Sequence, residues 1–195
     1  MFLILIVFGS LKSYGLTNRP NTLLKKDKDT TKAKNVVLPL VFFLPETGLG
    51  FGVTGISTFR LKNEVAPSRP SQVIYSAAYT LKNQLLIFAP YEIYSDSGKH
   101  RFQGELGFYK YFYNFYGIGK SSQTQDLEKY SVTFPRVDFL YSREVRPNLF
   151  IGSGFRFDYF NINEIKDSGI LEQTKPTGFK GGTKLNAQIS LRQDK

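Results

Sequence analysis

The segment Lys99–Gly119, KHRFQGELGFYKYFYNFYGIG, decides the fold because its side chains alternate strictly in character from Phe102 onward. One set comprises Phe102, Gly104, Leu106 and Phe108, and the other comprises Gln103, Glu105, Gly107 and Tyr109. A period of two is the signature of a β-strand whose two faces meet different surroundings. Because large aromatics lie on one face and polar groups on the other, the pattern predicts a strand of a transmembrane β-barrel, with lipid outside and a polar lumen inside.

The same alternation recurs along the rest of the chain. The further predicted strands are Val36–Leu44, Gly50–Lys62, Ser71–Leu81, Gln84–Tyr94, Tyr130–Arg143, Leu149–Asn161 and Thr183–Gln193. A tilted membrane strand needs about 9–11 residues, so each segment can cross a bilayer. No segment shows a convincing apolar stripe at a spacing of about 3.6 residues. The sequence therefore predicts an all-β fold, an antiparallel transmembrane β-barrel with about eight strands present.

Two segments precede the predicted barrel domain, which covers residues 36–195. Residues 1–15 contain a short apolar run, Phe2–Phe8, followed by the small-x-small tripeptide Ser13-Tyr14-Gly15, which is typical of a secretory signal peptide. The apolar run is too short for a membrane-spanning helix. Residues 16–35 are polar and lysine-rich, so we expect a flexible leader.

Composition excludes several classes of function. The 195-residue chain suffices for one domain and contains no cysteine, which rules out disulfides, thiolate metal sites and a cysteine nucleophile. The net charge of +10 is dispersed over the chain, so we expect no nucleic-acid partner. The single histidine, His100, lies beside a predicted turn, and metal-ligand spacings, phosphate loops and nucleophile elbows are missing. We therefore expect no enzymatic activity, cofactor, metal site or identifiable small-molecule substrate.

Two Arg-x-Asp tripeptides, Arg136–Asp138 and Arg156–Asp158, fall on the polar faces of neighbouring predicted strands. A register slip of one residue would move every side chain to the wrong face, so the inward residues restrict the pairing. A five-residue loop, Glu144–Asn148, meets this condition and pairs Arg143 with Leu149. Arg136 then faces Arg156, with Asp138 and Asp158 as diagonal neighbours. We predict a structural charge network in the lumen, and a charged ring that selects solutes is the alternative.

Three segments taken together resemble a known family: Val37–Gly55 (VLPLVFFLPETGLGFGVTG), Gly104–Gly119 and Gly181–Lys195. The chain resembles the bacterial surface-antigen barrel domain of the BamA/TamA outer-membrane superfamily, particularly its short members without periplasmic POTRA domains. Two motifs contribute most, Pro45-Glu46-Thr47-Gly48 before one strand and Tyr116-Gly117-Ile118-Gly119 after another.

The resemblance implies a protein of the bacterial cell outer membrane, with lipid as its partner and the outer-membrane assembly machinery acting on it during insertion. It also implies a role in outer-membrane protein assembly or translocation, although residues 16–35 are too few for a POTRA domain. Family barrels usually have sixteen strands, so we expect this chain to hold the N-terminal half. Two alternatives remain: a complete eight-stranded membrane barrel with a structural or small-ligand-binding role, and a soluble barrel that binds an apolar ligand.

Loop lengths suggest an orientation. We expect the short turns at Lys82-Asn83 and Glu144–Asn148 on the periplasmic side and the long loop Asn163–Gly181 at the cell surface.

Overall fold

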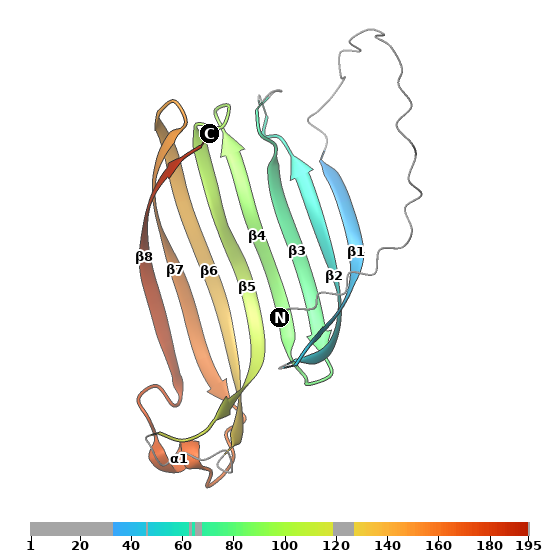
Figure 1. Ribbon diagram of the computed structural model, residues 1–195, viewed down its shortest axis with the longest axis vertical. Coiled ribbons are helices and arrows are strands. Elements are labelled where there is room, and N and C mark those ends of the chain that lie inside the picture. The colour runs from blue at the N-terminus through green and yellow to red at the C-terminus, as the bar shows by residue number, and fades with distance from the viewer. Residues whose placement is uncertain (1–32, 46, 63, 65–67, 119–126, 195) are drawn as a thin grey trace.

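The computed structural model describes residues 33–45, 47–62, 64, 68–118 and 127–194. They form one sheet of eight strands in sequence order, each antiparallel to the next (Figure 1). The strands are β1 (Lys34–Leu44), β2 (Gly48–Phe59), β3 (Ser71–Thr80), β4 (Leu85–Ser95), β5 (His100–Phe115), β6 (Glu128–Arg146), β7 (Leu149–Asn163) and β8 (Gly181–Gln193). The predicted all-β fold and its antiparallel strands are confirmed.

The sheet is open. Its strand order begins with β1 and ends with β8, and no ladder joins these two edges within the described residues. The residues of the predicted signal peptide, most of the leader, Glu46 and Gly119 lie outside the described part of the chain.

The sheet carries its apolar side chains on the more exposed face. On β5 the even-numbered residues from Phe102 to Phe112 belong to what we call the apolar face, and the odd-numbered residues from Arg101 to Tyr113 belong to the polar face. Leu106 is 53% exposed on the apolar face, whereas Arg101 on the polar face is 2% exposed. This arrangement is the reverse of a water-soluble sheet, which buries its apolar side.

Aromatic side chains fill part of the polar face near the end that carries the long loops. Tyr109, Val132 and Phe134 are buried there, and the rings of Tyr109 and Phe134 stack with centroids 5.0 Å apart. Partly buried neighbours pack around them: Leu86, Phe88, Tyr111, Tyr130, Phe160 and Ile162. The polar face is therefore divided into an aromatic region and a charged region.

Two interior strands contain proline, and each interrupts one ladder. The pairing of β4 with β3 is broken around Pro90, and the pairing of β6 with β7 is broken around Pro135. Proline has no N–H to donate, so one neighbour of each strand loses a ladder hydrogen bond. Pro39 lies on the edge strand β1, where an N–H can be spared.

The loop between β7 and β8 contains a short helix, α1 (Ile170–Thr174), which the sequence pattern does not predict. Its Leu171 N–H donates a hydrogen bond of 3.0 Å to the Glu128 carboxylate at the start of β6. This bond holds the loop against the sheet at the lower end of Figure 1. No helix in the described part of the chain is long and apolar enough to cross a bilayer.

The predicted placement of the two short turns on one side is wrong. Lys82-Asn83 connects β3 to β4, whereas Pro147-Asn148 connects β6 to β7. Three antiparallel strands separate these turns, so they lie at opposite ends of the sheet (Figure 1). The turn at Lys82-Asn83 shares its end with the loop after β7.

Candidate functional site

An ionic network on the polar face is the strongest candidate site. At its centre, Asp158 of β7 is 1% exposed and bonds two arginines. Arg136 Nε of β6 lies 2.6 Å from Asp158 Oδ1, and Arg156 Nε lies 3.1 Å from Asp158 Oδ2. Both carboxylate oxygens are therefore charge-paired, as a buried carboxylate requires.

The pairing of these residues differs from the predicted register. Arg136 lies directly opposite Asp158, and Asp138 directly opposite Arg156, so the prediction that Arg136 faces Arg156 is wrong. The reason is that the loop is only Pro147-Asn148, since Arg146 pairs with Leu149, and a one-residue irregularity between Glu144 and Arg146 follows it. Arg143 therefore pairs with Ile151, two residues beyond the predicted Leu149. The inward side chains stay on one face, and opposite charges now face each other directly.

The central network extends across neighbouring strands. Glu105 Oε1 of β5 accepts a hydrogen bond of 2.6 Å from the Tyr109 hydroxyl and lies 3.4 Å from Arg136 Nη1. Gln188 Nε2 of β8 donates to Asp138 Oδ1 at 2.9 Å. The four residues of the predicted charge network thus have polar partners that belong to strands β5 to β8.

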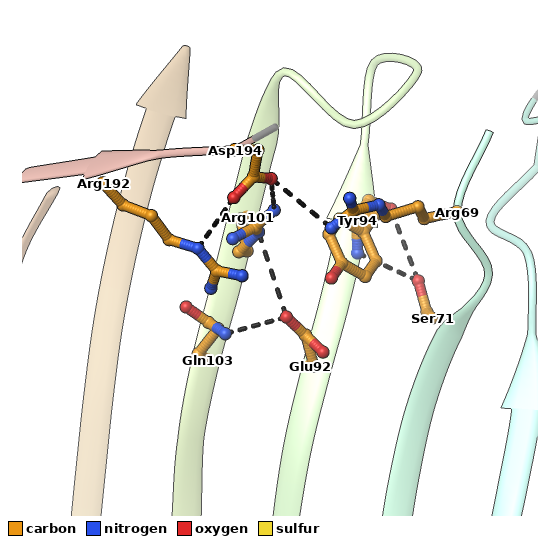
Figure 2. Close-up of polar contacts among 8 residues, drawn as sticks. All are labelled: Arg69, Ser71, Glu92, Tyr94, Arg101, Gln103, Arg192 and Asp194. Carbon is orange, nitrogen blue, oxygen red and sulfur yellow. Dashed lines mark hydrogen bonds and ion pairs between the residues drawn. The ribbon is translucent and has the colours of Figure 1, made fainter. Parts of the chain in front are cut away.

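A second cluster lies near the end of the sheet that carries the β4–β5 turn (Figure 2). The Arg101 guanidinium lies over the rings of Tyr94 and Phe150, 5.1 and 4.8 Å from their centroids. Arg101 Nη2 donates to Asp194 Oδ2 at 3.0 Å. Arg101 Nε is buried without a hydrogen bond, 3.9 Å from Glu92 Oε1. The carboxylate of Asp194 is therefore the hydrogen-bonded anionic partner of this buried cation.

Asp194 also forms ion pairs with two further arginines. Arg69 Nη1, before β3, lies 3.4 Å from its Oδ2, and Arg192 Nε lies 2.8 Å from its Oδ1. Burial by itself would raise the pKa of the Asp194 carboxyl, but the hydrogen bonds and positive charges of Arg101 and Arg192 outweigh burial and lower it. The backbone N–H of Asp194 donates to the Asn148 carbonyl at 2.8 Å. Sequence reasoning missed this cluster because 93 residues separate Arg101 from Asp194.

The family-like motifs form turns and are not part of either cluster. Thr47 N–H donates to the Leu44 carbonyl at 3.2 Å, and Gly48 adopts φ +68°, which glycine tolerates best. The Pro45 carbonyl accepts a hydrogen bond of 3.0 Å from Lys82 Nζ, so this turn contacts the next short turn at the same end.

The second motif follows β5. Tyr116 is exposed, and Gly117 adopts φ +85° as the chain leaves the strand. Both residues directly follow the end of β5.

His100 precedes Arg101 on β5, but it lies on the opposite, apolar face and belongs to neither cluster. Its Nδ1 is 2.7 Å from the Tyr141 hydroxyl, with the two rings stacked at 5.9 Å. The described residues contain no group of side chains that could hold a metal ion. The geometry of both clusters is that of structural ion pairs.

No family model, curated protein or solved structure matches the chain.

Proposed function

We propose that this chain forms a section of the wall of a transmembrane β-barrel in a bacterial outer membrane. Its apolar face lies against lipid and its polar face lines the lumen. The observation that carries the proposal is the inverted distribution of side chains, with charges paired on the polar face and large apolar groups exposed on the other. Membrane barrels require this arrangement.

The uncharged band on the apolar face has the height of a membrane. On β5 it runs from His100 to Lys110, and the opposite residues on β6 are Arg143 and Thr133. No charged residue lies on the apolar face between these rows in the described strands. At about 3.3 Å per residue and a tilt of about 40°, the step from His100 to Lys110 corresponds to about 25 Å, which matches the apolar band of outer-membrane barrels.

The loops suggest an orientation for the barrel. Outer-membrane barrels have short periplasmic turns and longer extracellular loops. We place the Asp96–Lys99 and Pro147-Asn148 turns in the periplasm, and the loop with α1 outside the cell. The Glu144–Asn148 turn and the Asn163–Gly181 loop keep the sides expected from the sequence, whereas the turn at Lys82-Asn83 moves to the outside of the cell.

The edges β1 and β8 suggest that further strands complete the wall. Unpaired backbone groups are costly in lipid, so both edges need partners. On the polar face β1 carries apolar side chains such as Val36 and Leu38, whereas β8 carries polar ones such as Lys184 and Asn186, so direct pairing of the two edges would set apolar beside polar side chains. This mismatch favours a larger barrel over a complete eight-stranded one, in keeping with the sixteen strands of the BamA/TamA family that the sequence resembles.

A role in outer-membrane protein assembly or translocation is proposed on that resemblance alone. The proposal assigns the chain no catalysis, cofactor or nucleic-acid partner. The process that we propose is insertion of the chain into the membrane by strand pairing, with lipid on one face of the wall.

Expression of the complete gene product in a Gram-negative bacterium tests the proposal. We expect the protein in the outer-membrane fraction, resistant to extraction by alkaline carbonate and by urea. Recovery of folded protein in the soluble periplasmic fraction would contradict the proposal and favour a soluble ligand-binding sheet.

A further inference from the structure

We propose that Arg69 and Arg101, with the rings of Tyr94 and Phe150, form a carboxylate-binding site whose ligand is the chain's own Asp194. The bound carboxylate acts as a clasp that holds the end of β8 across the polar face. This inference rests on the folded sheet and does not depend on where the protein resides.

The contact joins parts of the sheet that are not neighbours. Arg101 belongs to β5, and two strands lie between β5 and β8. Arg69 immediately precedes β3, and four strands lie between β3 and β8. A carboxylate that follows β8 nonetheless lies within 3.4 Å of both guanidinium groups, because the sheet curves at this end. Figure 2 shows Asp194 between the side chains of Arg192, Arg101 and Arg69.

The site is lined by a buried cation and two aromatic rings. Arg101 is 2% exposed and stacks against two aromatic rings that come from β4 and β7. Arginine cannot lose its proton in a protein, so its burial requires an anion. Glu92 lies 3.9 Å from Arg101 Nε, beyond hydrogen-bond distance, and its Oε1 accepts a hydrogen bond from Gln103 at 2.8 Å. Arg101 thus depends on Asp194.

The ligand chemistry is that of a carboxylate. Oδ2 of Asp194 faces Arg69 and Arg101, while Oδ1 accepts the bond from Arg192. A neutral amide has one acceptor oxygen and could not serve both sides. The same residues border a cavity of about 200 Å³, so removal of the Asp194 side chain leaves room for a small free carboxylate such as formate.

Chemical rescue tests the clasp. The chain has no native cysteine, so cysteines introduced at Pro70 and Leu191 carry the only spin labels on the full chain refolded in detergent micelles. Both positions are exposed and flank the clasp. The parent protein should give a narrow distance distribution, and Asp194→Ala should broaden it. Added formate should restore the narrow distribution, whereas chloride at equal ionic strength should not.

Two comparisons control the experiment. Asp167→Ala removes an exposed aspartate from the loop after β7 and should leave the distribution narrow. Asp194→Asn keeps the size of the side chain, so it should broaden the distribution and resist rescue because the amide fills the site. Should Asp194→Ala fail to fold, a broadened distribution in Asp194→Asn still supports the clasp.

The proposal is overturned if both Asp194 variants keep the narrow distribution, or if formate and chloride act alike on Asp194→Ala. These results are independent of membrane location. A chain found in the soluble fraction would defeat the proposed function and leave the clasp standing.

Discussion

Arg136 on β6 and Asp158 on β7 lie directly opposite each other, with Arg136 Nε 2.6 Å from Asp158 Oδ1. The pair sits on the face of the sheet that is both more polar and more buried. A charged ladder of this kind ties neighbouring strands together where a soluble sheet would have apolar contacts.

Asp158→Asn should destabilise the sheet by about 3 kcal/mol, because removal of one partner of a buried ion pair leaves uncompensated charge. Arg156 would lose its carboxylate partner, and Arg136 would keep only Glu105, 3.4 Å away. Urea unfolding in detergent micelles measures the free energy of unfolding of each variant. The control Asp167→Asn, in an exposed loop, should change it by about 0.5 kcal/mol or less. Equal effects of the two variants would show that the Asp158 network contributes nothing.

Gly104→Ala should destabilise the sheet by about 1–3 kcal/mol, because an added Cβ would overlap the Asp138 carbonyl and approach the Tyr91 hydroxyl. Tyr91 lies across this glycine and donates a hydrogen bond of 3.2 Å to the same carbonyl. Gly182→Ala on β8 is the matched control, since no atom lies within 4 Å of its added Cβ. That change should stabilise by about 0.5–1 kcal/mol. Comparison of their urea midpoints checks the predicted opposite signs.

The clasp should weaken in acid. The pKa of Asp194 lies below its ordinary value of 3.8, so its contribution to stability is complete above that value and declines as the pH falls through the folded-state pKa. The groups around it are the cations Arg69, Arg101 and Arg192, with Glu92 and Tyr94 nearby. The distribution of distances between the two spin labels, measured as a function of pH, should broaden at low pH. In Asp194→Asn the same profile should be flat over this range, and a parent profile that is flat as well would contradict the assignment.

Leu106→Arg should cost about 2–4 kcal/mol of folding free energy in lipid vesicles, because it places a charge near the middle of the apolar band. Ser95→Arg is the control, since Ser95 pairs with His100 at the rim of the band. Its cost should be about 0–1 kcal/mol. The equilibrium between folded and urea-unfolded protein in vesicles measures both, and equal costs would argue against a membrane band at this height.

Alternation at a period of two was enough to predict the strands and the face of each side chain, because the two faces of the sheet differ in polarity and successive side chains of a strand point to opposite faces. The register at Arg136 could not be predicted, because the two-residue length of the loop and the one-residue irregularity between Glu144 and Arg146 both depend on the geometry of the turn. The five-residue helix α1 also escaped prediction. It is too short for an apolar stripe, and a distant carboxylate, Glu128, binds its first turn.

The clasp was beyond sequence reasoning for a different reason. Arg101 is recognisable as a polar-face residue, but its partner Asp194 follows the last strand and reaches it only through the curvature of the whole sheet. The alternation in the sequence predicts on which face of the sheet a side chain lies. It does not predict which side chains from distant strands it contacts on that face.

The most direct test of the central claim uses the absence of tryptophan from the chain. Phe155→Trp places a single fluorophore on the apolar face of β7, and Phe160→Trp places one on its polar face. Each variant of the full-length protein is folded into vesicles that contain lipids brominated along their acyl chains. We predict strong quenching of the indole fluorescence in the Phe155→Trp variant and weak quenching in the Phe160→Trp variant. Equal quenching in the two variants, or stronger quenching in Phe160→Trp, would contradict a sheet whose apolar face lies in lipid.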